Sequence, residues 1–374
     1  MQESWSSHLK TDEYEIEVNS IISLTTRLIQ FETTTKENIN LAVDYCSEWL
    51  RQRGIETTFI NNDGYKSLIA EIGEKGPIII FNGHLDVVPA EADQFFPFVD
   101  DGKIYGRGSF DMLGAVSVMM HAFVELSKKT LPARVILSLV PDEETGGEKG
   151  TGYLVENGIL GDMVICGETT NLDIAVQAKG ILQISLEFLG TASHGSRPWL
   201  GENAILKAFH AYKEIERLDL FKEKSQFFDR PSINLARIHG GGAINRVPDR
   251  CSLILDIRYL PDQNPEDILD QIRGITDAEL KIISRGDPVK TNPLNEFVIR
   301  LKDTAENVLG SDVRIFGQDG SADTRFYATR GIPAVEFGPR GANHHGKGEY
   351  VFINSLLDFK SILIDYVMSY SKKS

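Results

Sequence analysis

The sequence predicts an α/β protein in which a layered domain is interrupted by a smaller α+β domain. In the first two-fifths of the chain, helical and strand-like patterns alternate, which is typical of helices packed around a largely parallel sheet. Near Gly180 the order becomes strand–helix–strand–strand–helix–strand, as in a ferredoxin-like unit. After Thr291 the first pattern resumes. We therefore expect one domain from residues 1–179 and 291–374, and an inserted domain from residues 180–290.

Apolar spacing predicts the elements of the first domain in order. Residues 15–30 place Ile, Val and Leu at helical intervals, and residues 38–53 do the same and stop before Gly54. Short apolar runs rich in β-branched residues then predict strands. The expected strands are 56–60, 67–72, 77–81, 133–140, 163–166 and 334–337. The other expected helices are 115–126, 296–309 and 355–368.

The inserted domain shows a different pattern. Residues 183–188 read Gln-Ile-Ser-Leu-Glu-Phe, so polar and apolar side chains alternate and one face of that strand is buried. At about 110 residues, the insertion has a normal domain size. Its expected strands are 181–189, 232–238, 250–259 and 280–284, and its expected helices are 203–218 and 265–275.

Composition disfavours nucleic-acid binding and indicates a cellular compartment. The formal net charge is −15, and an acidic chain is poorly suited to binding nucleic-acid phosphates. Cys46, Cys166 and Cys251 form no Cys-x-x-Cys pair, which fits a reducing compartment. The first fifteen residues lack a signal-peptide pattern, and no apolar run approaches the ~18 residues of a membrane span. We expect a soluble cytoplasmic protein that binds neither nucleic acid nor membrane.

The segment "PDEETGG", residues 141–147, places three carboxylates where a buried strand should end. Asp142, Glu143 and Glu144 repel one another in a partly buried place, so a positive charge should offset them. Because the carboxyl ends of parallel strands open onto ligand crevices, a binding site is expected there.

Four other loops carry unusual polar residues. His84 and Asp86 are two apart and point to the same side of an extended chain. Asp111 opens an apolar helix, where by itself it is typical of an N-cap. Glu168 follows an apolar strand and by itself is typical of a solvated residue. His344 and His345 are adjacent in a glycine-rich loop, where packing seldom requires them.

Taken together, the loops predict a metal centre. Imidazole and carboxylate donors without thiolate suit Zn²⁺, or Mn²⁺ and Co²⁺ as relatives. Five protein ligands exceed the three of one catalytic zinc, but they suit two ions about 3.5–4 Å apart that share a carboxylate. The five predicted ligands are His84, Asp111, Glu144, Glu168 and His345.

The motifs "GHLDVVP", "GRGSFDMLGA", "PDEETGG" and "GET" resemble, in order and spacing, those of a metallopeptidase family. That family includes acetylornithine deacetylase, succinyl-diaminopimelate desuccinylase, aminoacylase-1 and glutamate carboxypeptidase. The resemblance covers nearly the whole chain. It implies a zinc-peptidase-like catalytic domain with an inserted ferredoxin-like domain that serves as lid and dimer interface.

The resemblance also implies roles for the site residues. It implies His84 and Glu168 on one metal ion, Glu144 and His345 on the other, and Asp111 bridging both. Glu143 is then the general base and Asp86 the residue that orients a ligand. His345 is preferred to its neighbour His344 because the spacing His-x-x-x-Glu to Glu349 is similar to the family's closing motif.

The inserted domain carries further residues that the resemblance implicates. His194 would stabilise the oxyanion, often from the partner subunit of a homodimer; its alternative role is to cap the following helix. Asn245 and Arg258 would bind a substrate carboxylate, although Arg258 has Asp256 and Asp262 as alternative partners. Gly320 and Ser321 match the family's site-lining loop, where Ser321-Ala322 departs from its usual residues and leaves the substrate open.

These features predict a hydrolase that uses two divalent ions, most readily zinc, to cleave the amide bond of an N-acyl amino acid. A desuccinylase or deacetylase is the leading interpretation. The alternatives are an exopeptidase of the same family and, from another class, a non-catalytic binding protein on the same scaffold.

Overall fold

The computed structural model describes residues 2–371, with side chains from residue 14 onward. The chain divides into two compact units. The first unit consists of residues up to Val176, Thr291–Phe316 and the residues from Ala322 onward. The second unit consists of Gln177–Lys290 and Gly317–Ser321. The short segment 317–321 thus belongs to the second unit although it lies beyond the insertion in sequence.

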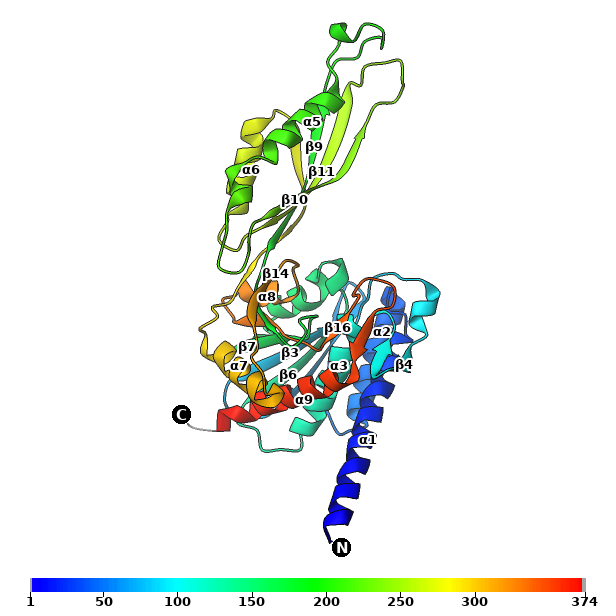
Figure 1. The fold of residues 1–374 in the computed structure, drawn as a ribbon, viewed down its shortest axis with the longest axis vertical. Helices are drawn as coiled ribbons and strands as arrows, with labels where there is room; N and C mark the ends of the chain where they lie inside the picture. Colours follow the sequence, from blue (N-terminus) through cyan, green and yellow to red (C-terminus); the bar gives the residue numbers. More distant parts are fainter. Residues whose placement is uncertain (1, 372–374) are drawn as a thin grey trace. The chain divides into compact units, whose positions relative to one another are not determined.

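A mixed sheet forms the centre of the first unit (Figure 1). Its inner strands are parallel, and their side chains are almost all buried, so they form near-continuous apolar runs. The outer strands β1, β2 and β8 pair antiparallel. Seven of its nine strands lie in the spatial order β1 (Thr58–Asn62), β2 (Tyr65–Ile72), β6 (Arg134–Val140), β3 (Ile78–His84), β7 (Met163–Cys166), β15 (Ala334–Glu336) and β8 (Ile174–Ala178).

Helices cover both faces of this sheet, which confirms the predicted α/β layers. The helix α3 (Gly114–Leu126) packs on β3 and β6 and contacts α1 (Gln2–Ile29) and α9 (Ile353–Met368). The opposite face packs on α4 (Tyr153–Glu156) and α8 (Thr324–Ala328), whose Val155 and Tyr327 join Ile80 and Val164 in one buried cluster. The remaining helices are α2 (Lys36–Arg51), which packs on β2, and α7 (Glu296–Leu309), which packs on α9.

A second, small sheet in the first unit is absent from the sequence prediction. Its strands are only two or three residues long, too short for a visible period. It pairs Tyr350 with Tyr105 and thereby places the carboxyl-terminal loop beside the loop before α3. Its strand order is β16 (Gly341–Ala342), β17 (Tyr350–Phe352), β5 (Lys103–Tyr105) and β4 (Phe98–Asp100).

The second unit has the predicted order of strands and helices (Figure 1). Its antiparallel sheet has the order β10-β11-β9-β12, and alternate residues of β9 and β11 pack against α5 and α6. The ferredoxin-like interpretation is therefore confirmed. The bounds are β9 (Gly180–Leu189), α5 (Ala204–Ile215), β10 (Ser232–Gly240), β11 (Arg250–Tyr259), α6 (Pro265–Ile275) and β12 (Glu279–Gly286).

Two expectations need correction. The N-cap interpretation of Asp111 is wrong, because α3 begins at Gly114 and Asp111 has non-helical backbone angles in the preceding turn η2 (Ser109–Leu113).

The expectation that no segment is long and apolar enough to cross a membrane is also wrong. Ser109–Leu126 meets both criteria, but 83% of it is buried inside the protein, as in the core helix of a globular domain.

Candidate metal centre

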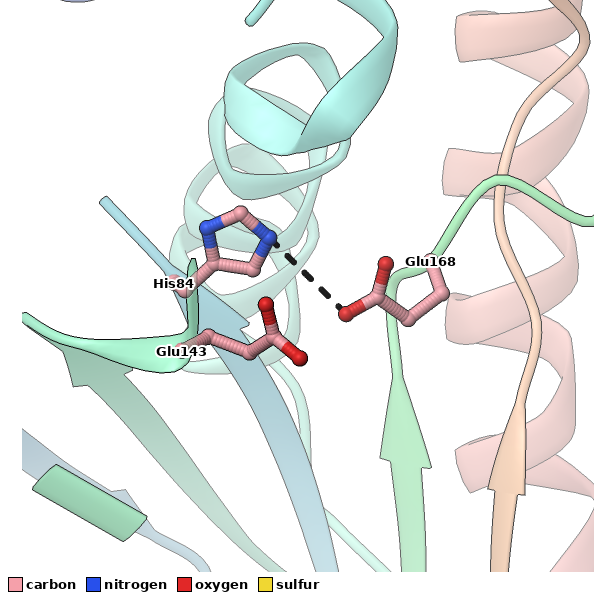
Figure 2. Close-up of side chains that lie close together, drawn as sticks. All are labelled: His84, Glu143 and Glu168. Carbon is pink, nitrogen blue, oxygen red and sulfur yellow. Dashed lines mark ion pairs between the residues drawn. The ribbon is translucent and has the colours of Figure 1, made fainter. Parts of the chain in front are cut away.

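The predicted ligands of the first unit lie at one edge of the sheet. His84 is the last residue of β3, Glu143 and Glu144 form the turn η3 (Glu143–Thr145) after β6, and Glu168 follows β7. Because β6, β3 and β7 are parallel neighbours, their carboxyl ends meet. Figure 2 shows the side chains of His84, Glu143 and Glu168 directed toward one another from these three strand ends.

The first group of donors centres on His84. Its Nε2 lies 3.3 Å from Oδ1 of Asp111 and 3.8 Å from Oε1 of Glu168. Donor atoms of His84, Glu143 and Glu168 all lie within 4.8 Å of one another. The imidazole of His84 is 1% exposed, whereas Glu143 is half-buried.

The second group centres on His345. Its Nε2 lies 3.1 Å from Oε1 of Glu144 and 3.2 Å from Oδ2 of Asp111. Asp111 therefore directs one oxygen to His84 and the other to His345, which is the arrangement of a carboxylate shared between two ions. The adjacent His344 instead lies beside the ring of Phe110, with 6.4 Å between ring centroids.

The hydrogen bonds of His84 indicate whether its Nε2 is free to bind a cation. Nδ1 lies 2.8 Å from the backbone carbonyl oxygen of Asp86, so Nδ1 carries the proton of the neutral ring. Nε2 then directs a lone pair at the carboxylates of Asp111 and Glu168. Such an arrangement needs a positive charge between the groups, supplied by a proton or by a metal ion. The donor set therefore fits a divalent cation.

The electrostatic environment of the site also favours a positive charge among these groups. Burial disfavours the charged imidazole of His84, yet its hydrogen bond with Asp111 and the nearby carboxylates raise its pKa well above the usual value. Hydrogen bonds with Asp111 and Glu144 raise the pKa of His345 to about 10. Burial, with the charge of Asp111, raises the pKa of Glu168 well above its usual range.

Asp86 has contacts that the sequence did not reveal. Its carboxylate accepts hydrogen bonds from the backbone nitrogens of Glu143 and Glu144, at 3.1 and 3.0 Å. The same carboxylate is 3.6 Å from Nδ1 of His84, so the Asp86 carbonyl, rather than the carboxylate, makes the bond that sets the ring's tautomer. Asp86 thus fixes the end of β3 and the turn η3 relative to each other.

The first carboxylate of "DEE" has a structural role. Asp142 accepts hydrogen bonds from the backbone nitrogens of Lys149 and Gly150, at 2.8 and 2.7 Å. Gly147 has a φ of +72°, and a Cβ there would collide with the carboxylate of Asp323. Asp142 and the glycines therefore fold the turn, which leaves Glu143 and Glu144 directed into the site.

In the second unit, His194 and Asn245 lie in adjoining exposed loops. The backbone nitrogen of Gly195 donates to the carbonyl oxygen of Asn245 at 2.7 Å, and His194 forms a β-bridge with Arg246. The N-cap of α5 is Asn203, whose side chain accepts hydrogen bonds from the first turn. The alternative in which His194 caps this helix is therefore wrong.

Arg258 lies at the other end of the second unit. His194 and Asn245 belong to loops beside Arg250, where β11 begins, and Arg258 follows Arg250 by eight positions along this strand, a rise of about 26 Å. The guanidinium of Arg258 pairs with Asp256, with Nε 3.0 Å and Nη2 3.3 Å from its two oxygens.

Gly320 and Ser321 belong to the Arg258 end of the second unit. The backbone nitrogen of Lys179 donates to the carbonyl oxygen of Gln318, two residues before Gly320. The next residue, Gly180, pairs with Tyr259, which adjoins Arg258. Within one chain, the second unit thus holds two separate groups of predicted catalytic and substrate-binding residues.

Comparisons with known proteins agree with this geometry. Residues 80–369 match peptidase family M20/M25/M40. A succinyl-diaminopimelate desuccinylase from Hahella chejuensis is 30% identical, over 85% of this chain and 89% of that enzyme. The desuccinylase of Thioalkalivibrio sulfidiphilus is 27% identical, over 91% of this chain and 96% of that enzyme.

Solved structures show a similar fold. Aminopeptidase PepT from Bacillus cereus superposes with a TM-score of 0.80 at 19% identity, covering 95% of this chain and 99% of that chain. The M20 family metallo-carboxypeptidase Sso-CP2 from Sulfolobus solfataricus has a TM-score of 0.75 at 19% identity, covering 92% of this chain and 98% of that chain. At these identities the likeness concerns the fold alone.

Proposed function

Because this chain belongs to peptidase family M20/M25/M40, a family of metal-dependent hydrolases, we propose that it cleaves the amide bond of an N-acyl amino acid with two divalent ions. The desuccinylase names of its relatives make N-succinyl-diaminopimelate the first substrate to test. The observation that carries the proposal is the position of Asp111, with one oxygen 3.3 Å from His84 and the other 3.2 Å from His345.

This geometry supports an assignment of the ligands. His84 and Glu168 would hold a first ion, Glu144 and His345 would hold a second ion, and Asp111 would be shared. Imidazole and carboxylate donors favour zinc, with cobalt and manganese as functional substitutes. When bound, such a pair polarises the scissile carbonyl and lowers the pKa of the attacking water to about 7.

Glu143 is the proposed general base. Its carboxylate lies within 4.8 Å of the donor atoms of His84 and Glu168, which places it within reach of a water molecule held there. It would take the proton of that water and deliver it to the leaving nitrogen of the amide. The bond from Glu143 N to Asp86 keeps the backbone of the base in place.

The two groups in the second unit support a homodimer. Arg258, Gly320 and Ser321 lie at one end of the unit, and His194 and Asn245 lie at the other. Because a strand of about 26 Å separates them, one copy cannot easily present both groups to one small substrate. We propose that His194 and Asn245 complete the site of the partner subunit, while Arg258 binds a carboxylate of the substrate in its own subunit.

We also propose a cytoplasmic location, which the thiols support. Cys46, Cys166 and Cys251 are free and buried, which supports a reducing compartment and hence the cytoplasm.

Metal analysis and a hydrolysis panel test the proposal. The purified protein should bind two Zn²⁺ per chain and lose activity when a chelator removes them. The panel should contain N-succinyl-diaminopimelate, N-acetylornithine, other N-acyl amino acids and dipeptides, each with Zn²⁺, Co²⁺ or Mn²⁺. Preferential turnover of dipeptides would favour the exopeptidase alternative. Fewer than one ion per chain without any hydrolysis would favour a binding protein.

A further inference from the structure

We propose that Glu349 is a positioning residue for the metal pair, because its carboxylate holds the loop that presents Asp111. This inference rests on the proposed function, in which Asp111 is the ligand shared by both ions. The carboxylate of Glu349 accepts from Arg107 and from backbone nitrogens of this loop. It acts through the backbone of residues 106–111.

Both oxygens of Glu349 are fully used by this loop. Oε2 accepts from Nη1 of Arg107 at 2.6 Å and from the backbone nitrogen of Gly108 at 3.0 Å. Oε1 accepts from the backbone nitrogens of Phe110 and Asp111, each at 3.0 Å. Glu349 is 1% exposed and Arg107 is 3% exposed, so water cannot replace these partners.

The loop needs such an acceptor because its backbone is irregular. Asp111 has φ and ψ of −117° and 92°, which interrupts the turn η2 before α3 begins. Buried backbone N–H groups must be paired, and the Glu349 carboxylate pairs three of them. With its backbone held in this way, Asp111 directs its carboxylate between His84 and His345.

Glu349 also joins the two loops that hold the second ion. It follows His345 by four residues, and its own carbonyl oxygen accepts from the backbone nitrogen of Gly106 at 3.0 Å. The next residue, Tyr350, pairs with Tyr105 in the small sheet. The position of His345 relative to Asp111 therefore depends on Glu349. We expect the loss of Glu349 to weaken the binding of the second ion more than that of the first.

Titration of the metal-free full-length protein with Co²⁺ tests this proposal. Glu349→Gln keeps the size of the side chain but replaces one acceptor oxygen with an amide nitrogen, which leaves two donors unpaired. We expect one of the two Co²⁺ ions to bind about 10- to 100-fold more weakly by calorimetry. We also expect a changed visible absorption spectrum, which reports the coordination of the ion.

A second variant and a control separate positioning from simple stabilisation. Glu349→Asp keeps the charge but reaches fewer donors, so its Co²⁺ affinity should lie between those of the wild-type protein and Glu349→Gln. If Glu349→Gln does not fold, the Co²⁺ affinity of Glu349→Asp is the one compared with that of the wild-type protein. Lys360→Met is the control, because Lys360 pairs with Glu17 and Glu125 away from the site. It should lower the melting temperature and leave both Co²⁺ affinities and the spectrum unchanged.

The outcomes are distinct. Two Co²⁺ ions bound by both Glu349 variants with wild-type affinity and spectrum would overturn the proposal, whatever happens to the melting temperature. Loss of affinity by Lys360→Met to the same degree would also overturn it, because destabilisation alone would then explain the effect. Failure of the wild-type protein to bind two ions would instead remove the proposed metal pair itself.

Discussion

The carboxylate of Asp86 accepts a hydrogen bond from the backbone nitrogen of Glu143 over 3.1 Å. Its other oxygen accepts from the backbone nitrogen of Glu144, and its carbonyl oxygen accepts from the imidazole of His84. One buried residue therefore contacts a proposed ligand of each of the two ions, His84 and Glu144, and the proposed base, Glu143.

The first prediction concerns Asp86. Asp86→Ala removes both carboxylate acceptors, so the η3 turn loses its anchor and the base moves relative to the metal ions. We expect kcat to fall about 10- to 100-fold, with a smaller change in KM. Asp86→Asn keeps one acceptor oxygen and should lose less. Wild-type kcat in Asp86→Ala would show that the turn holds its position without this anchor.

The second prediction concerns Glu143. Glu143→Gln keeps the shape of the side chain but cannot accept a proton from water. We expect kcat to fall by about 10²- to 10⁴-fold or more, while metal analysis still finds two ions per chain. Unchanged kcat would remove Glu143 from its proposed role. Loss of one ion together with activity would make Glu143 a ligand instead.

Much of the fold was predictable from local patterns. The predicted bounds of β11, α6 and α7 match the structure because each element has a clear signal. In β11 buried and partly exposed residues alternate, while α6 and α7 begin after the N-caps Asn264 and Asn295. The loops that hold the metal-binding residues were predictable only jointly, since His84 or Asp111 alone has an ordinary structural explanation.

Long-range contacts were not predictable in the same way. Asp86 and Glu143 are 57 positions apart, and Glu349 and Asp111 are 238 apart. No local period records such pairings. The spacing from His345 to Glu349 was the one signal for the latter residue. The pair of Arg258 with Asp256 is local by contrast, and side-chain geometry at the end of β11 decides between Asp256 and Asp262.

The third prediction concerns the ion pair between Arg258 and Asp256. A substrate carboxylate must compete with Asp256 for the guanidinium of Arg258, so removal of Asp256 should free it. We expect Asp256→Asn to leave KM unchanged or lower it, and Arg258→Met to raise KM about tenfold or more, since hydrogen bonds to charged groups contribute ~1.5–3 kcal/mol. Equal increases of KM in both variants would indicate that the pair is only structural.

The fourth prediction concerns the partner subunit. His194→Ala and Glu143→Ala should each be nearly inactive as pure proteins. If His194 acts across the dimer, a mixed dimer of these two chains contains one complete site. Random pairing in a two-fold dimer should then restore about a quarter of the wild-type activity. No recovery after co-expression, with mixed dimers present by mass spectrometry, would place His194 in the site of its own chain or outside catalysis.

The last prediction concerns stability at acidic pH. His121 lies in α3, with Nδ1 2.8 Å from the carbonyl oxygen of Ser117, Nε2 2.8 Å from Oγ of Ser20, and its ring against Trp49. Burial lowers the pKa of His121 from 6.5 to about 4. Between these values the unfolded chain binds a proton that the folded chain does not, so protonation favours unfolding.

Above pH 6.5 the imidazole is neutral in both states and does not lower the free energy of unfolding. As the pH falls from 6.5 toward 4, protonation of the unfolded chain lowers that free energy. The full effect is about 3 kcal/mol, because each pKa unit corresponds to ~1.4 kcal/mol. His121→Gln can still donate to Ser117 and accept from Ser20, but it cannot titrate. Urea unfolding at pH 7, 5.5 and 4.5 should show a steeper loss of stability in the wild-type protein than in His121→Gln. Since both proteins keep every other titrating group, the difference in slope belongs to this one imidazole, and parallel curves would contradict its burial as a neutral side chain.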